Sequence, residues 1–475
     1  MKDYKLLING LWEDGHIIKE FKSPYDQKVF AAVHFADKKQ VQKAIHSAHA
    51  AFEKTKSLSS FERYEILCHI SSEIKRRKEE LAESITLSAG KTITSSRVET
   101  DRAANTFQVA AEEAKRQEGE LIPLDWSPQT KKRWGLIRRF PIGVVVGITP
   151  FNFPLNLVAH KVAPAIAAGN TFVLRPASQV SITSLLLGEI ICESGFPKGG
   201  INIVPCGYED ASPLLEDERV KKVTFTGSPE IGWALKKQAF KKKVTLELGG
   251  NAALVLEPDT DLDFALSRTL LGAFSYSGQI CISIQRIFLH ENIYDRFMTD
   301  FVAAAKKLKI GNPLDEDTDI GPMINTDAAQ QTEEWIHEAV EQGGHLLTGG
   351  LRKGNIFEPT ILENVKPELR ISSQEAFAPV VVVSPYKDFK EALKGVNNSI
   401  YGLQAGIFTK NLHKAFQAYE TLDVGGVIIN DIPTFRIDHM PYGGVKESGF
   451  GREGIKYAID EMTEMKLLAI NLNTQ

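Results

Sequence analysis

The sequence predicts an α/β protein with two doubly wound α/β domains and a small β element. Two observations support the domains: short apolar runs rich in β-branched residues alternate with helical patterns, and this alternation occurs in two successive blocks. Strands alternating with helices of about 10 to 15 residues are typical of βαβ units and a parallel sheet. A third observation supports the β element, because residues 119–139 and 460–475 fit neither block.

The chain begins with a region of predicted helices. From about residue 38 to 118 apolar residues recur at helical spacing, as in 38-KKQVQKAIHSAHAAFEKT-55, with charged residues between them. Residues 119–139 then contain two prolines and an alternating run, which predicts an excursion such as a β-hairpin.

The first alternating block predicts the first parallel sheet. Strands are expected at 142–148, 171–175, 201–205, 221–226 and 244–248, with helices at 154–169, 180–194 and 229–240. Ligands of such sheets bind at the carboxyl ends of the strands. Two loops follow such ends: 225-FTGSPEIGWALKK-237 offers glycines where a helix begins, and 173-VLRPASQ-179 offers a cation and hydroxyl groups. Each loop alone could be an ordinary turn, but together they favour a dinucleotide-binding domain over 1–118 and 140–248.

The second block predicts a second α/β domain over 249–440. Strands are expected at 252–256, 284–290, 380–385, 404–408 and 427–430, with helices at 261–274, 291–308, 326–343 and 411–421. Residues 441–459 return to the cofactor domain. The segment 463–470 is expected to form a terminal strand that could pair across a subunit boundary.

Composition excludes several classes of function. The 475 residues are 43% apolar and 24% charged, and the net charge is −4, so no overall field attracts nucleic acid or an acidic membrane. The nearly uncharged stretch 140–160 contains three prolines, which argues against a membrane span. The N-terminus does not resemble a signal peptide. Four cysteines without a C-x-x-C pair disfavour a metal site and fit a reducing cytoplasm.

Three side chains are candidates for carbonyl chemistry. Cys281, in 275-SYSGQICIS-283, could be a nucleophile, although a lone cysteine is more often a small buried apolar residue. Glu247 ends an apolar strand before Gly-Gly, where burial would raise its pKa and suit it to act as a base, with a strand-end ion pair as the alternative. Asn152 lies in the turn 149-TPFNFPLN-156 and could donate to an oxyanion or be structural.

Together these stretches resemble the aldehyde dehydrogenase superfamily over nearly the whole chain. The matching segments are 149-TPFNFP-154, 173-VLRPAS-178, 225-FTGS-228, 246-LELGG-250, 278-GQIC-281, 374-QEAFAPV-380 and 441-PYGGVKESGFGREG-454. The resemblance implies an NAD(P)-dependent, non-acylating enzyme in a homodimer or homotetramer. It also implies that 249–440 is the catalytic domain and that 119–139 and 460–475 form an oligomerisation element. Within the family, the chain is most similar in kind to members that oxidise semialdehydes, lactaldehyde, or phospho- and sulfo-aldehydes.

The resemblance also implies roles for individual residues. Cys281 attacks the aldehyde carbon, Asn152 holds the oxyanion, and Glu247 activates the water that releases the carboxylate. Glu464, in MTEMK, matches an acidic position that relays protons. The expected cofactor contacts are Thr149, Pro150, Phe151, Arg175, Ala177, Ser178, Gly207, Phe225, Thr226, Gly227, Ser228, Leu248, Glu375 and Phe377.

Two positions bear on the cofactor. Arg175 stands where the family usually has Lys, and Ser178 stands where members that prefer NAD often have Glu. Loss of that carboxylate removes repulsion of a 2′-phosphate, and a guanidinium fork suits phosphate. The sequence therefore predicts that NADP is tolerated or preferred.

Four basic side chains are candidates for substrate contacts: Arg102, His160, Arg436 and His439. Each could instead make an ordinary salt bridge or helix-end contact. In the family, the region of 434-TFRIDHMPYGG-444 usually borders the substrate tunnel, so the resemblance implies that several of these cations lie near the tunnel entrance. We therefore predict a short aldehyde with an anionic tail: a carboxylate, phosphonate, sulfonate or phosphate.

Rival functions come from other classes. A CoA-acylating enzyme would not need Glu247, and a catalytically silent structural member would not need Cys281, Glu247 and Asn152 together. A thiol hydrolase would need a histidine beside Cys281, and the sequence identifies none.

Overall fold

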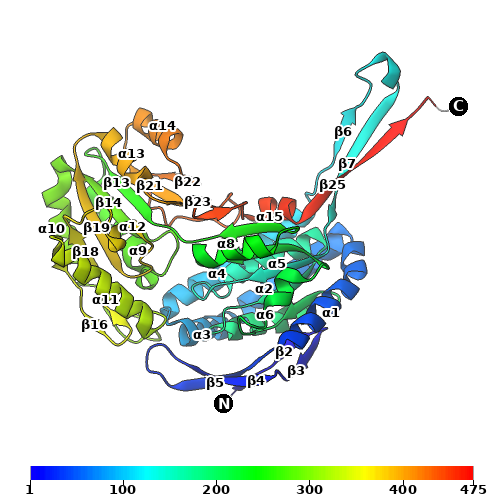
Figure 1. Ribbon diagram of the computed structural model, residues 1–475, viewed down its shortest axis with the longest axis horizontal. Coiled ribbons are helices and arrows are strands. Elements are labelled where there is room, and N and C mark those ends of the chain that lie inside the picture. Colours follow the sequence, from blue (N-terminus) through cyan, green and yellow to red (C-terminus); the bar gives the residue numbers. More distant parts are fainter. Residues whose placement is uncertain (1, 474–475) are drawn as a thin grey trace.

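The structure is a computed structural model that describes residues 2–473. It has two α/β lobes and a three-stranded arm that projects from one of them (Figure 1). The larger lobe contains α1–α6 and α8, and the smaller contains α9–α14. The predicted α/β class is confirmed, because two large sheets dominated by parallel strands form the framework of the lobes.

The larger lobe is organised around an eight-stranded sheet in the order β24-β12-β11-β8-β9-β10-β2-β3. Its parallel strands are β8 (Val144–Ile148), β9 (Thr171–Arg175), β10 (Ile201–Ile203), β11 (Val220–Thr226) and β12 (Lys243–Glu247). Antiparallel β24 (Gly449–Phe450) extends one edge, and β2 (Leu6–Ile8) and β3 (Leu11–Glu13) extend the other. The chain runs from β8 outward to β10 and then crosses to β11, so the order reverses beside β8, where doubly wound sheets bind ligands.

Helices cover both faces of this sheet and form two apolar cores. One face carries α2 (Ser60–Arg76), α3 (Lys78–Ala89), α4 (Ile93–Ala114), α5 (Asn156–Ala168) and α6 (Ser181–Glu193). The other carries α1 (Lys38–Ser57), α7 (Ser212–Glu216) and α8 (Pro229–Gln238). Helix α1 begins where its sequence indicates, because Asp37 and Gln40 form a reciprocal capping box.

The N-terminal residues before α1 form strands for which the sequence analysis made no prediction. Besides β2 and β3, a separate sheet contains β1 (Lys2–Tyr4), β5 (Val29–Phe35) and β4 (Ile17–Lys22) in that order. Strand β4 is largely exposed on both faces. A strand without a buried face lacks the hydrophobic alternation on which recognition depends.

The smaller lobe has a seven-stranded sheet in the order β15-β18-β19-β14-β13-β21-β22. Its strands are β13 (Ala252–Leu256), β14 (Ile284–His290), β15 (His345–Thr348), β18 (Thr360–Glu363), β19 (Val380–Tyr386), β21 (Gln404–Phe408) and β22 (Gly426–Ile429). Its helices are α9 (Leu262–Phe274), α10 (Tyr294–Ala305), α11 (Thr326–Glu341), α12 (Arg370–Ser373), α13 (Phe389–Asn397) and α14 (Leu412–Thr421). Short pairs add β16 (Arg352–Lys353) with β17 (Ile356–Phe357), and β20 (Tyr401–Gly402) with β23 (Val445–Lys446).

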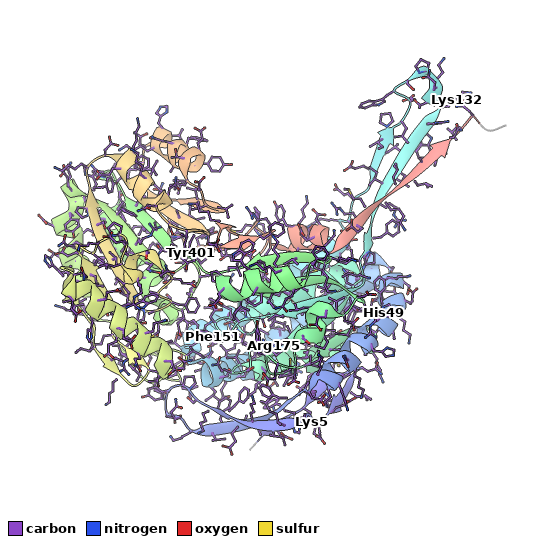
Figure 2. The ribbon with its side chains drawn as sticks, viewed as in Figure 1. Lys5, His49, Lys132, Phe151, Arg175 and Tyr401 are labelled. Carbon is purple, nitrogen blue, oxygen red and sulfur yellow. The ribbon has the colours of Figure 1, made fainter. Side chains whose placement is uncertain are left out.

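The arm joins two segments that are distant in sequence. Strands β6 (Glu120–Pro123) and β7 (Arg133–Pro141) form the predicted hairpin, and β25 (Thr463–Asn471) pairs antiparallel with β7 along its whole length. Figure 2 labels Lys132 near the tip of this arm. Of the predicted element 460–475, residues 474 and 475 lie outside the described part of the chain, as does residue 1 of the first domain.

The return segment, 441–459, contacts both lobes, because its strand β23 pairs with β20 of the smaller lobe. Strand β24 pairs with the end of β12, and α15 (Ile455–Glu461) packs against α5. Within residues 2–473, no helix has the length and apolar character needed to cross a membrane.

Candidate active site

A cavity of about 790 Å³ lies where the carboxyl ends of β8, β11 and β12 face the loop that follows α9. The three predicted catalytic residues line it together: Asn152 follows β8, Glu247 ends β12, and Cys281 follows the α9 loop. A thiol, a carboxyl group and an amide in one enclosed space can supply a nucleophile, a base and an oxyanion donor for carbonyl chemistry.

The backbone before Cys281 is strained. Tyr276, Ser277 and Gly278 have consecutive left-handed φ angles of 48°, 53° and 68°. Such a conformation costs a non-glycine residue about 1–2 kcal/mol, so it persists only where the surroundings impose it. A Cβ at Gly278 would lie 2.0 Å from the carbonyl oxygen of Ala378, which makes glycine necessary there. This turn directs the chain so that Cys281 reaches the cavity.

Hydrogen bonds hold the cysteine loop in place. Ser277 Oγ donates to the carbonyl oxygen of Gly321 at 2.7 Å. Asn152 Nδ2 donates to the carbonyl oxygen of Gln279 at 3.0 Å, which ties the amide to the backbone two residues before Cys281. The second hydrogen of this NH₂ group can therefore point at an oxygen bound next to the sulfur.

A buried ion pair supports the Asn152 turn. Glu99 Oε1 accepts the backbone N–H groups of Leu155 at 2.9 Å and of Asn156 at 3.1 Å, where α5 begins. Its other oxygen pairs with Lys91, and both side chains are almost completely buried. A carboxylate at a helix N-terminus satisfies backbone donors that have no partner inside the helix.

Cys281 has a specific polar neighbour. Its Sγ lies 3.1 Å from the hydroxyl of Tyr442. Burial raises the pKa of Cys281 to about 12, while the hydrogen bond with Tyr442 and the positive charge of Arg436 act in the opposite direction. Cys281 therefore depends on nearby donors and cations to become a thiolate.

The surroundings of Glu247 suit a general base. It is 3% exposed, and neither carboxyl oxygen has a hydrogen-bond partner among the described residues. Burial, followed by the charge of Glu453, raises the pKa of Glu247 well above its ordinary value. A Cβ on Gly443 would lie 2.9 Å from Glu247 Oε1, so glycine there leaves room for the carboxyl group.

A buried charge network that the sequence analysis missed lies beside Glu247. Glu453 Oε1 accepts from Lys161 Nζ at 2.5 Å, and Glu453 Oε2 accepts from Arg436 Nη2 at 3.2 Å. Burial alone would raise the pKa of Glu453, but the cations Lys161 and Arg436 outweigh it and lower the pKa to about 2. The sequence did contain a clue to this network, because Glu453 is the last charged residue of the glycine-rich motif 451-GREG-454.

The structure does not bring Glu464, the predicted proton relay, to this cavity. Its side chain is 65% exposed on β25 and pairs with Lys243 at 2.6 Å. Glu464 follows the buried Thr463, and strand alternation therefore turns its side chain outward. The acidic residue that does lie next to Glu247 is Glu453.

The strand ends of the larger lobe carry polar atoms that fit a dinucleotide. Thr149 Oγ1 after β8, Arg175 Nε at the end of β9 and Thr226 Oγ1 at the end of β11 are buried without hydrogen-bond partners among residues 2–473. Buried polar atoms normally have partners, so a row of unpaired ones marks a place for a polar ligand. Figure 2 labels Phe151 and Arg175, both of which lie in the larger lobe.

The predicted cofactor contacts divide into two groups. Eight of them line the cavity itself: Pro150, Phe151, Thr226, Gly227, Ser228, Leu248, Glu375 and Phe377. The other six, Thr149, Arg175, Ala177, Ser178, Gly207 and Phe225, lie outside its lining. Glu375 accepts the backbone N–H of Gly250 at 3.0 Å, and burial raises its pKa to about 7. The rings of Phe151 and Phe377 meet edge to face at 5.8 Å.

Two of the four predicted substrate cations line the cavity. The guanidinium of Arg436 lies over the ring of Tyr442 at 3.7 Å, and its side chain is 8% exposed. Its Nε has no hydrogen-bond partner within residues 2–473. Arg102 also lines the cavity, with Nη2 2.7 Å from Asp438 Oδ1.

The two histidines are placed differently from the prediction. His160 Nε2 is 3.0 Å from Asp438 Oδ1, but the ring is buried behind the lining, and burial followed by the charge of Arg436 lowers its pKa. His439 is exposed and outside the lining. His160 points inward because α5 is buried along its whole length.

The class of this protein follows from its two α/β lobes and from the thiol, carboxyl group and amide that lie between them. The chain belongs to the aldehyde dehydrogenase family, whose model matches residues 12–468. The protein is therefore an NAD(P)-dependent enzyme that oxidises an aldehyde, and members of the family use NAD or NADP.

Similar proteins cover nearly the whole chain. It is 45% identical over 473 residues to the 3-sulfolactaldehyde dehydrogenase of Priestia aryabhattai, with 99% of each chain covered. Aldehyde dehydrogenase 21 from Physcomitrella patens, in complex with the reaction product succinate, shares 48% identity at a TM-score of 0.98, covering 100% and 99%. Glyceraldehyde-3-phosphate dehydrogenase GapN from Methanocaldococcus jannaschii, complexed with NADP, shares 41% identity at a TM-score of 0.91, covering 95% and 98%.

Proposed function

We propose that this enzyme oxidises a short aldehyde with an anionic group, namely a carboxylate, sulfonate or phosphate, to the corresponding acid. The observation that carries the proposal is Arg436, a buried guanidinium in the cavity lining whose Nε has no partner among the described residues. A buried guanidinium with a spare N–H donor favours an anionic ligand, because a buried donor without an acceptor is costly and an anion is its strongest acceptor.

The charges around Arg436 support this reading. Asp438 pairs with Arg102 and contacts His160, so it offsets the charge of Arg102. Glu453 is shared between Arg436 and Lys161, which leaves this group one positive charge in excess. Arg102 adds further N–H donors at the cavity wall. The compounds named for two of the similar proteins, sulfolactaldehyde and succinate, are also anionic.

In the proposed mechanism the thiolate sulfur of Cys281 bonds to the aldehyde carbon, and the carbonyl oxygen becomes an oxyanion held by the Asn152 amide. Thr149, Arg175 and Thr226 would hold a dinucleotide at the strand ends, and its nicotinamide would supply the hydride acceptor. Loss of hydride from the tetrahedral carbon leaves a thioester with Cys281. Glu247 then accepts a proton from water while the water oxygen bonds to the carbonyl carbon, and the carbon–sulfur bond breaks to regenerate the thiolate.

We infer that Arg175 and Ser178 permit or favour NADP. Arg175 ends β9, the neighbour of β8, beside which the strand order reverses, and its Nε is among the unpaired buried atoms. Ser178 is half-buried and carries no negative charge that would repel a 2′-phosphate. A preference for NAD of about 100-fold in kcat/KM, roughly 3 kcal/mol, would contradict this inference.

We further infer that the arm assembles the chain into a homodimer or homotetramer. Its strands and the connection between β6 and β7 expose large apolar residues: Leu121, Trp126, Met465, Leu467 and Leu468. Such exposure on a projecting three-stranded sheet is typical of an interface. A solution mass equal to one chain, measured by light scattering, would contradict assembly.

The substrate proposal is tested with matched aldehydes. Succinic semialdehyde and its neutral isostere 4-methylpentanal differ in the terminal carboxylate, and 3-sulfolactaldehyde extends the comparison to a sulfonate. We expect Arg436→Met to reduce kcat/KM for the anionic aldehydes by at least about 100-fold, roughly 2.7 kcal/mol, and to affect 4-methylpentanal much less. An equal loss for both types would contradict a role in anion recognition, and dependence of turnover on CoA would contradict hydrolysis by Glu247.

A further inference from the structure

The tyrosine of 441-PYGG-444 is unusually well fixed beside the proposed nucleophile. Tyr442 is 3% exposed, and its hydroxyl lies 3.1 Å from Cys281 Sγ. Its backbone exchanges two hydrogen bonds with Glu453: the N–H of Tyr442 donates at 3.1 Å, and the N–H of Glu453 donates back at 2.7 Å. The ring also supports the guanidinium of Arg436 at 3.7 Å. The phenol is therefore held from both its backbone and its ring face.

The environment of Cys281 otherwise opposes a thiolate. Burial disfavours the charged form, and the carboxyl groups of Glu247 and Glu375 act in the same direction. The groups that act in favour of the thiolate are the hydroxyl of Tyr442 and the charge of Arg436. Because a buried charge without a donor is costly, a hydrogen bond at this position has a large effect.

Tyr442 can act only as a donor once the sulfur has lost its proton. A neutral thiol and a phenol can each donate to the other, but a thiolate can only accept. Cys281 Sγ is the hydrogen-bond partner that the structure shows for this hydroxyl. Hydrogen bonds to charged acceptors are stronger than those between neutral groups, so the contact favours the thiolate over the thiol.

We propose that Tyr442 is a catalytic residue that donates its hydroxyl hydrogen to the thiolate of Cys281, with Arg436 stacked on its ring to hold the phenol in this orientation. The inference rests on the proposed role of Cys281 as nucleophile. No covalent bond changes at Tyr442: the phenol keeps its proton before and after sulfur attacks the aldehyde. Arg436 then has two connected roles. Its guanidinium is the proposed anion-binding group, and it stacks on the ring of Tyr442, whose hydroxyl stabilises the thiolate.

The test is the pH dependence of Cys281 alkylation in the full enzyme without aldehyde or cofactor. Iodoacetamide reacts with thiolates, and peptide mass spectrometry separates Cys281 from the exposed Cys192 and the half-buried Cys68. Tyr442→Phe removes the hydroxyl and keeps the ring. We expect its alkylation midpoint to rise by at least about one pH unit, so that alkylation below both midpoints is roughly tenfold slower.

Tyr386→Phe is the matched control. Tyr386 is also 3% exposed, and its hydroxyl bonds to Glu257 and to the backbone of Leu256 in the smaller lobe rather than to the cysteine. Its alkylation midpoint is expected to equal that of the wild type. An unchanged or lower midpoint in Tyr442→Phe would overturn the proposal, as would an equal rise in both variants.

A second variant tests the same proposal if Tyr442→Phe does not fold. Tyr442→3-fluorotyrosine retains the ring and the donor but makes the phenol more acidic and a stronger donor, so the midpoint is expected to fall. A rise or no change would overturn the proposal. Because alkylation requires no substrate, its outcome is independent of whether the enzyme prefers anionic aldehydes.

Discussion

The buried pair of Glu99 and Lys91 predicts a large and specific loss of stability in Glu99→Gln. Lys91 is 1% exposed, and its Nζ lies 3.6 Å from the ring centre of Phe153 and 4.6 Å from that of Tyr276. Removing the Glu99 charge leaves Lys91 buried without its anion. Breaking a buried pair in this way costs about 3–5 kcal/mol.

The cost of releasing a proton from Lys91 sets an upper bound of similar size on this loss of stability. Burial lowers the pKa of Lys91 from its ordinary value of 10.5, so the side chain can respond to the loss of its partner by becoming neutral. Neutralising a lysine of ordinary pKa at pH 7 costs about 5 kcal/mol. Glutamine retains a carbonyl oxygen for the backbone N–H groups of Leu155 and Asn156, so the substitution isolates the charge.

Urea unfolding at pH 7 measures this loss, with steady-state activity recorded alongside it. Glu79→Gln is the control, because Glu79 pairs with Arg97 at the surface and its removal is expected to change the unfolding midpoint little. Combining Glu99→Gln with Lys91→Met should recover much of the stability, since no unpaired charge remains. A loss below about 1 kcal/mol in Glu99→Gln, the scale of an exposed pair, would refute the reasoning.

Three further predictions concern chemistry, cofactor choice and pH. Glu247→Gln should retain a burst of reduced nicotinamide and lower steady-state turnover by about 10²–10⁴-fold, because acylation precedes the step that needs the base; loss of the burst as well would argue against this order. Arg175→Ala should reduce kcat/KM for NADP about tenfold more than for NAD, an extra cost of roughly 1.4 kcal/mol, and equal losses would contradict contact with the 2′-phosphate. The pKa of Glu453 is raised by burial but lowered more by Lys161 and Arg436, from 4.5 to about 2. The folded protein therefore binds fewer protons than the unfolded chain between these values, so this carboxylate stabilises the fold above about pH 4.5, and the contribution is lost as pH falls towards 2. Lys161→Met should reduce this loss in acid unfolding, and an unchanged pH profile would contradict it.

Helices with one apolar face were predictable because burial imposes a periodic pattern, and central strands were predictable as short continuous apolar runs. Strands β8 and β13 illustrate the second case, since they are buried from end to end. Strand β4 and the short edge strands carry no such pattern, because much of their surface meets solvent. Their pairing depends on neighbours that are distant in sequence.

The candidate site divides in the same way. Cys281, Glu247 and Asn152 could be proposed from ordered motifs, since each lies at a turn or strand end whose local sequence is distinctive. The local sequence did not reveal that Glu453, rather than Glu464, lies beside Glu247. The position of a residue in a strand determines only which face of the sheet its side chain takes, and not which distant residues lie near it. Nor did it show that Asp438 offsets the charge of Arg102 and contacts His160.

By itself the sequence determined the α/β class, the family and the residue types available for carbonyl chemistry, because these follow from periodic burial and contiguous motifs. Tertiary structure alone decided which charges meet. The contact of Tyr442 with Cys281 joins residues 161 positions apart, and the Lys161–Glu453 pair joins residues 292 apart. Such contacts arise from how two sheets and a return segment pack together, and the electrostatics of the site depend on them because Coulomb interactions follow spatial distance rather than position in the chain.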